Sequence, residues 1–228
     1  MNLLFLDTET TGLTEPRLIQ IAYKSGDTLT CELFKPPVPI EIEAMAVHHI
    51  TEKHVKSKDA FQGSKIFHEL TSILPDSILI AHNAKFDISI LNIEGLNVNK
   101  YICTYKVAAH MYDLPQHKLQ YLRYLWGVDI DEASAHDAKG DVLVLEQVFN
   151  RMVDDYSTAN NLTKEETIKK FIEISSKPIL QKKINFGKHN GKTFEEIKQI
   201  DPSYMQWLQT LGDKDEDFKY TVQYHSQP

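Results

Sequence analysis

The sequence predicts an α/β fold: a mixed five-stranded sheet flanked by helices, followed by a small C-terminal module. Short apolar runs of strand length recur over the first half of the chain, and turns alone separate the second from the third. The later runs alternate with segments whose apolar residues recur at helical spacing. After about residue 155 the chain becomes polar, and it regains apolar residues only in its tail. A length of 228 residues suits one α/β domain with a small appendage.

Five segments are predicted as strands. Residues 2–7 form an unbroken apolar run that ends in acids, as expected for a strand buried on both faces. Residues 18–23 and 28–34 follow, and Ser25-Gly26-Asp27 suits the hairpin between them. Residues 77–81 and 101–104 supply the last two strands.

The predicted helices lie between and after these strands. Residues 40–74 are expected to be mostly helical and irregular, and a helix after residue 81 has Asn83 as its candidate N-cap. Helices are also expected over 105–111 and over 119–125, the latter ending before Gly127. A long helix is expected from near Asp137. Strands first, then strands alternating with helices, favours a sheet covered by helices on both faces.

The chain is expected to divide into a domain over 1–155, a helical linker over 156–178 and a small module over 179–228. Thr163, with Glu166 three residues later, predicts the start of the linker helix through a capping box. Pro178 is expected to end it. Phe186 and Trp207 are interpreted first as core residues of the module, with base stacking as the alternative.

Composition places the chain among globular proteins, with 42% hydrophobic and 25% charged residues. Its first apolar run is too short for a signal peptide, and no run approaches the length needed to span a bilayer. Cys31 and Cys103 lie far apart without metal-ligand spacing, which indicates reduced thiols. We therefore expect a cytoplasmic protein with no membrane partner.

The net charge of −7 argues against a nucleic-acid partner, because phosphate contacts usually come from Lys and Arg. That objection weakens for a protein that meets phosphate through bound cations, since cations reverse the local field of clustered carboxylates. Net charge alone therefore decides little.

Three polar clusters follow apolar segments, and each supplies a carboxylate. Alternation along an extended chain puts Asp7 and Glu9 on the same side, where both can face one cation. Asp87 lies in the expected first turn of a helix, and His136 precedes Asp141 by five residues at the start of the long helix. Taken singly, each has a structural explanation: a polar strand end, a carboxylate favoured by the helix dipole, and a surface histidine beside the capping residue Asp137.

Together, these clusters resemble the DEDDh exonuclease family, which has a ribonuclease H-like fold. The matching stretches are Leu-Asp-Thr-Glu-Thr-Thr-Gly-Leu (6–13), His-Asn-Ala-Lys-Phe-Asp (82–87) and His-Asp-Ala-Lys-Gly-Asp (136–141). Within that family, residues 44–51, 102–104, 186–192 and 201–208 are similar to the exodeoxyribonuclease X group. His49 stands where many relatives have Gly, so no role is assigned to it.

The resemblance implies a 3′→5′ exonuclease in which Asp7, Glu9, Asp87 and Asp141 hold two divalent cations. Oxygen ligands favour Mg²⁺, with Mn²⁺ able to substitute. His136 would be the general base, a role that suits its ordinary pKa of about 6.5. The same resemblance assigns substrate binding to four residues, although core packing is an equal alternative for two of them, Leu13 and Phe86. The four are Thr10, Leu13, Asn83 and Phe86.

The expected substrate is the 3′ end of DNA, cut to nucleoside 5′-monophosphates during repair or end trimming. A 3′→5′ exoribonuclease acting on RNA ends or short oligoribonucleotides remains open, because nothing in the motifs reads the 2′-hydroxyl. A nucleic-acid-binding subunit with an inactive exonuclease fold is the non-enzyme alternative. Residues 177–192 contain five lysines and no acid, which suggests contact with the substrate backbone or, alternatively, a solvated face.

Overall fold

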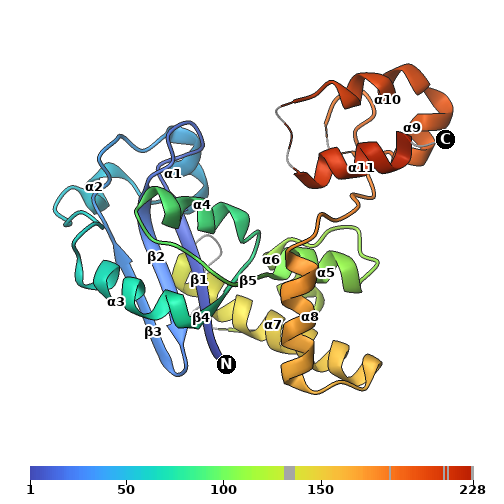
Figure 1. Cartoon of the computed structure of the whole chain (residues 1–228). Helices are drawn as coiled ribbons and strands as arrows, with labels where there is room; N and C mark the ends of the chain where they lie inside the picture. Colours follow the sequence, from blue (N-terminus) through green and yellow to red (C-terminus); the bar gives the residue numbers. More distant parts are fainter. Residues whose placement is uncertain (131–136, 185, 213, 215, 227–228) are drawn as a thin grey trace. The chain divides into compact units, whose positions relative to one another are not determined.

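The computed structural model describes residues 1–130, 137–184, 186–212, 214 and 216–226. The chain divides into two compact units, Met1–Ser175 and Ser176–Pro228 (Figure 1). The first unit contains the sheet and eight α-helices among its described residues, and the second is helical.

The sheet of the first unit is mixed and five-stranded, as predicted, with the order β3-β2-β1-β4-β5. The central strand β1 is antiparallel to β2 and parallel to β4, and β5 is parallel to β4. β3 forms an antiparallel hairpin with β2. The strands are β1 (Asn2–Thr10), β2 (Leu18–Ser25), β3 (Thr28–Leu33), β4 (Ser77–Ala81) and β5 (Tyr101–Cys103).

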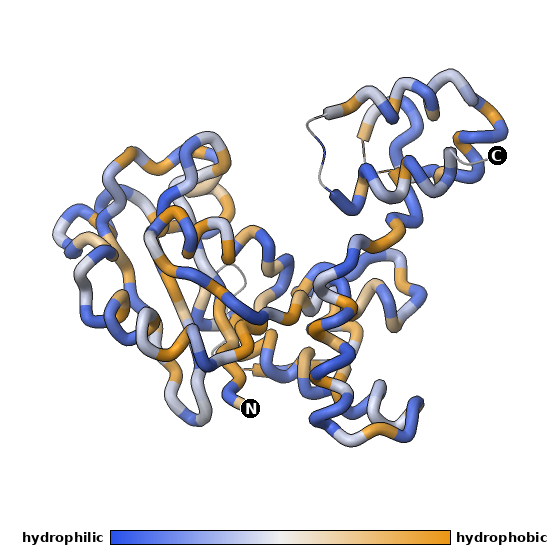
Figure 2. Tube along the Cα trace, viewed as in Figure 1, coloured by the Kyte–Doolittle hydropathy of each residue, from blue (hydrophilic) through white to orange (hydrophobic). Residues whose placement is uncertain are grey.

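Helices cover both faces of this sheet, and alternation along β1 determines which side chains meet which helices (Figure 1). Leu4 and Leu6 join a core with α3 and α4, whereas Phe5 joins a core with α5, α6, α7 and α8. The strands contain hydrophobic stretches, whereas the loops that connect them are mainly hydrophilic (Figure 2). The helices are α1 (Ile42–His48), α2 (Glu52–Val55), α3 (Lys65–Ile73), α4 (Lys85–Ile93), α5 (Thr104–Met111), α6 (Leu119–Leu125), α7 (Ala138–Asn160) and α8 (Lys164–Ser175), with the short 3₁₀ helix η1 (Leu74–Asp76).

The central strand is longer than predicted. We expected it to end at Asp7, but β1 continues to Thr10, and its pairing with β2 becomes irregular only after Glu9. Hydrogen bonding to β2 carries the strand through polar residues that its apolar run alone did not include. Asp7 and Glu9 therefore lie within the strand, opposite Ala22 and Gln20.

The segment predicted as a linker, 156–178, is distributed differently in the structure. α7 continues through its first residues to Asn160, and α8 packs against β5, α5 and α7. The expected capping box is present, since Thr163 N–H donates to Glu166 and Glu166 N–H donates to the Thr163 hydroxyl. The buried Phe171 joins the core of the first unit, so α8 belongs to that unit and the division falls after Ser175.

The described part of the second unit contains a loop and three helices: α9 (Phe194–Ile200), α10 (Pro202–Gln209) and α11 (Glu216–Ser226). Phe186 packs on the core of this unit, as predicted, but Trp207 is 45% exposed, so its prediction as a core residue is wrong. Among the residues that the model describes, no helix is both long and apolar enough to cross a membrane. The core of the unit consists of Ile184, Phe194, Ile197, Tyr204, Met205, Leu208, Phe218 and Val222.

Candidate metal centre

Three carboxylates meet where β1 passes the N-terminus of α7. One ligand oxygen each from Asp7, Glu9 and Asp141 lie within 4.8 Å of one another. Asp7 and Glu9 share the alternation of Phe5, which faces α7, and Asp141 lies in the first turn of that helix. The predicted pairing of Asp7 with Glu9 on one side of an extended chain is therefore present, and α7 supplies the third acid.

Asp87 stands next to this group on the opposite face of the strand. Thr8, which alternates with Asp7 and Glu9, donates to one Asp87 oxygen through both its amide (3.1 Å) and its hydroxyl (2.8 Å). Asp87 is 3% exposed and belongs to the first turn of α4. One strand thus presents two acids to α7 and holds a fourth acid on α4.

Burial and mutual repulsion raise the pKa values of these acids. The pKa of Asp7 lies well above its ordinary value because the group is buried and because Asp87, Asp141 and Glu9 are negative. The pKa of Glu9 is raised from 4.5 to about 8, first by burial and then by the charges of Asp141 and Asp87. Burial also raises the pKa of Asp87 from 3.8 to about 7, although the bonds from Thr8 oppose the rise. Clustered buried carboxylates are costly unless cations compensate them.

The donor set fits hard divalent cations. All four side chains offer carboxylate oxygens, which Mg²⁺ and Mn²⁺ prefer, and among the described residues the close group contains no His or Cys. Bound cations would lower the raised pKa values by supplying the missing positive charge. Both Thr8 bonds go to the same Asp87 oxygen, Oδ1, and they hold this carboxylate beside the other three acids.

An apolar cavity of about 380 Å³ adjoins this centre and shares Glu9 with it. Three of the four residues predicted to bind substrate line the cavity: Thr10, Leu13 and Phe86. Leu13 is 81% exposed, so core packing does not explain it. Phe86 is half-buried and packs on the α3–α4 core as well as lining the cavity.

Glu41 holds the loop that carries Leu13. Its carboxylate accepts from the amides of Leu13 (3.3 Å) and Thr14 (3.1 Å), and its own amide donates to the Thr11 carbonyl (2.7 Å). Gly12 adopts a φ of +145°, and a Cβ there would lie 2.1 Å from Glu41 Cδ. The positive φ of Gly12 and its close approach to the Glu41 side chain both favour glycine at this position.

The sequence predicts two further site residues, Asn83 and His136. Asn83 is not the N-cap of α4: it lies one residue before the cap residue Ala84 and has a φ of 67°. It is not among the residues that line the cavity. The Asn83 carbonyl accepts from Phe86 N–H, so the left-handed turn itself starts the helix. The predicted general base, His136, lies outside the described residues.

A protein-family model matches the part of the sequence that forms this site. Residues 4–149 match the exonuclease family model, which covers β1 to α7 and all four acids. This chain belongs to the exonuclease family. Its DEDDh resemblance, inferred from the motifs, is confirmed, and residues 184–209 of this exonuclease match the exodeoxyribonuclease X-like C-terminal model.

Curated relatives agree in length as well as in sequence. The exonuclease is 28% identical over 214 residues to exodeoxyribonuclease 10 of Escherichia coli (strain K12), covering 89% of this chain and 88% of that protein. It is 29% identical over 188 residues to the DNA polymerase III subunit epsilon of Treponema pallidum (strain Nichols), covering 73% of this chain and 85% of that one.

Solved structures show the same fold. A structure of exonuclease X in complex with 5′ overhanging duplex DNA matches with a TM-score of 0.56 and 24% identity, covering 76% of this chain and 99% of that one. The nuclease domain of 3′hExo, a DEDDh family member bound to rAMP, matches with a TM-score of 0.56 and 16% identity, covering 68% and 92%. The ribonuclease H-like fold predicted from the sequence is thereby confirmed.

Two glutamines of the exonuclease support the acids, and motif reasoning did not find them. Gln120 on α6 donates to Asp141 at 2.5 Å. Gln20 on β2 donates to Asp137 and accepts from Ala138 N–H, both at 3.2 Å, and so occupies the N-terminus of α7. Asp137 is the N-cap residue, as predicted, but its side chain makes no cap bond. No local pattern marks these glutamines, because their partners lie 21 and more than 100 residues away.

Proposed function

We propose that the protein is a 3′→5′ exodeoxyribonuclease that hydrolyses DNA from 3′ ends to nucleoside 5′-monophosphates, with Mg²⁺ as its cofactor. The observation that carries this proposal is the convergence of Asp7, Glu9 and Asp141 oxygens within 4.8 Å, beside the buried Asp87. Two of the similar proteins are named for DNA: exodeoxyribonuclease 10, and exonuclease X in its complex with duplex DNA. Their names support DNA over RNA as the substrate.

Each of the four acids would bind a divalent cation through its carboxylate. Two bound cations would supply the positive charge that a displacement at phosphorus needs, and Mn²⁺ would serve in place of Mg²⁺. Thr8 fixes Asp87, and Gln120 fixes Asp141, so two of the ligands are oriented before any cation binds.

His136 is proposed as the general base from its motif alone, taking the proton of the attacking water. The cavity beside Glu9 would receive the terminal nucleotide, with Leu13 and Phe86 against its base and Thr10 along the wall. Asn83 is proposed, also from its motif, to contact the bound nucleic acid.

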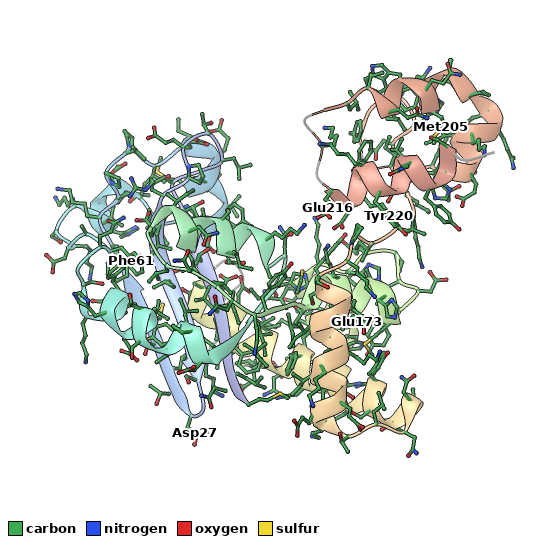
Figure 3. The ribbon with its side chains drawn as sticks, in the orientation of Figure 1. Asp27, Phe61, Glu173, Met205, Glu216 and Tyr220 are labelled. Carbon is green, nitrogen blue, oxygen red and sulfur yellow. The ribbon has the colours of Figure 1, made fainter. Side chains whose placement is uncertain are left out.

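Digestion of end-labelled substrates tests the proposal. Single-stranded DNA and RNA of equal sequence, labelled at the 3′ or the 5′ end, are incubated with Mg²⁺ or with EDTA. We compare wild type, Asp7→Ala and the matched control Asp27→Ala, which removes an exposed carboxylate at the β2–β3 hairpin (Figure 3). We expect stepwise loss of DNA from the 3′ end, abolished by EDTA and by Asp7→Ala but not by Asp27→Ala.

Other outcomes separate the alternatives. Preferential loss of RNA would replace the proposal with a 3′→5′ exoribonuclease. Binding of the DNA and the RNA without cleavage of either in Mg²⁺ would indicate an inactive fold that serves as a binding subunit. Loss from the 5′ end would overturn the proposed polarity.

A further inference from the structure

The second unit concentrates positive charge that the first unit lacks. Residues 1–175 contain 17 Lys or Arg against 25 Asp or Glu, whereas residues 176–228 contain 8 Lys against 7 acids. Within the second unit, residues 177–192 carry five lysines and no acid. Outside the metal centre, the net negative charge of the first unit repels a polyanionic substrate. The segment 177–192, by contrast, is positively charged and attracts one.

Backbone pairing brings two of these lysines together. Lys183 bridges Thr193 in antiparallel fashion, while Ile184 N–H donates to the Lys192 carbonyl at 3.0 Å and Gly191 N–H donates to the Ile184 carbonyl at 2.7 Å. Lys183 and Lys192 are both exposed at the base of this paired segment. The pKa of Glu196 is lowered first by hydrogen bonds from Thr193 and further by the charges of Lys192 and Lys183, so both charges act on the same side.

The tip of the segment packs on Tyr204 of α10. Gly187 has a φ of +67°, and a Cβ there would lie 2.3 Å from the Tyr204 hydroxyl oxygen. Lys188 Nζ lies 5.1 Å from the centre of the Tyr204 ring and 2.6 Å from an Asp201 oxygen, which also pairs with His189. The Lys188 side chain is nevertheless 61% exposed, so its outer surface faces solvent.

An exposed aromatic ring, that of Trp207, shares the Tyr204 contact with Lys188. The Trp207 ring contacts the Tyr204 ring at 4.9 Å between centroids, so Tyr204 is touched by both Lys188 and Trp207. Trp207 is 45% exposed although it belongs to a helix whose neighbouring residues Tyr204 and Leu208 are buried. A cation and an aromatic face are therefore held next to each other by a buried residue.

We propose that Lys183, Lys188, Lys192 and Trp207, the basic–aromatic face, bind a single nucleic-acid strand. The lysines contact its phosphodiester backbone, and Trp207 stacks on a base. The proposal rests on the proposed function, because the strand is the substrate of the first unit. A second contact on the same chain would keep a long strand bound between successive cleavages, since rebinding becomes intramolecular. The exposed Trp207, which shares the Tyr204 contact with Lys188, favours this ligand over an acidic protein surface, which the lysines alone would attract.

Salt dependence of binding in EDTA tests the face without cleavage. The full chain and a single-stranded oligonucleotide of about 30 bases are titrated over a range of KCl. We expect Lys183→Gln/Lys188→Gln/Lys192→Gln to reduce the slope of log K against log salt by about 2, because each contact to a single strand contributes about 0.7. The matched control, Lys164→Gln/Lys169→Gln/Lys170→Gln, removes three exposed lysines of α8 and should leave the slope unchanged.

Trp207 provides a direct second readout. In a Trp126→Phe background Trp207 is the only tryptophan, and we expect its emission to be quenched when the oligonucleotide is added. Trp207→Ala should weaken binding, whereas thermal unfolding should show that each variant remains folded. An unchanged slope together with unchanged Trp207 emission overturns the proposal and leaves the face to a protein partner or to solvent.

Hydrolysis of the nitrophenyl ester of thymidine 5′-monophosphate separates this failure from failure of the proposed function. The ester requires only the metal centre, so the triple variant should cleave it at the wild-type rate. If the ester and DNA are both left intact by wild type, the proposed function fails. If wild type cleaves both and the triple variant binds strands normally, only the basic–aromatic face is refuted.

Discussion

Glu9→Gln is expected to inactivate the enzyme while stabilising its metal-free form. The substitution keeps the shape of the side chain and removes one charge from the acid cluster. Above pH 8, ionised Glu9 costs the folded state the difference between a pKa of 4.5 and one of about 8. At about 1.4 kcal/mol per tenfold change, this is at most about 5 kcal/mol, and solvent screening of a half-buried group reduces it to about 1–3 kcal/mol.

The sign of the pH dependence follows from proton binding. Between pH 4.5 and about 8 the folded state holds a proton on Glu9 that the unfolded state has released. The free energy of unfolding of the wild type in EDTA therefore falls as the pH rises through this window. The contribution of protonated Glu9 is complete only below pH 4.5. The variant lacks this loss, so its advantage should be near zero at pH 4.5 and greatest above pH 8.

Calorimetry in EDTA measures the effect. We expect the melting temperature of Glu9→Gln to exceed that of wild type by roughly 3–10 °C above pH 8, given about 2–4 °C per kcal/mol for a chain of this size. Exonuclease activity in Mg²⁺ should fall at least about 100-fold. Asp27→Asn, at the exposed hairpin, is the control and should change neither (Figure 3). A variant that is less stable than wild type in EDTA, or equally shifted at every pH, would refute the reasoning.

Three further outcomes are expected. Gln120→Leu should lower kcat roughly 10–100-fold with little change in KM, because Asp141 loses the donor that orients it. Gln116→Leu on the preceding exposed loop is the control, and an unchanged kcat of Gln120→Leu would contradict the role. Glu41→Gln should raise KM for DNA roughly three- to tenfold by weakening its hold on the Leu13 loop, whereas an equal effect of Glu43→Gln would point to general charge instead. Mg²⁺ should raise the melting temperature of wild type more above pH 8 than near pH 5, and its binding should release protons in calorimetry at neutral pH; a larger rise at low pH would be inconsistent with the raised acid pKa values.

Sequence patterns predicted the parts of the fold that depend on local repetition. The bounds of β4 agree with the apolar run over 77–81, and α6 ends before Gly127 as expected. β1 was predicted too short because its last residues are polar, and only pairing with β2 keeps them extended. The helix α8 was assigned to a linker because its sequence is mostly polar, while its burial depends on Phe171 meeting α7 and β5.

The acids of the candidate site were predictable, but the residues that hold them were not. Asp7 and Glu9 can be recognised in the sequence because they alternate at the end of an apolar strand. Gln120 and Gln20 become informative only when the fold brings α6 and β2 to the N-terminus of α7. A glutamine carries no local signature of its partner, so tertiary proximity has to be known first. Glu41 is similar, since its acceptor role exists only where the chain returns to the Leu13 loop.

The centre depends on the register of one strand. Side chains alternate along β1, so Asp7 and Glu9 face α7 while Thr8 faces α4 and holds Asp87. A slip of one residue would exchange these faces, sending both acids away from Asp141 and leaving Asp87 without its donor. The apolar residues before them prevent that slip, because it would also move Leu4 and Leu6 out of their core. The irregular pairing begins only after Glu9, where the strand has already delivered its two acids and turns towards Leu13. Packing at the start of β1 therefore fixes the chemistry at its end.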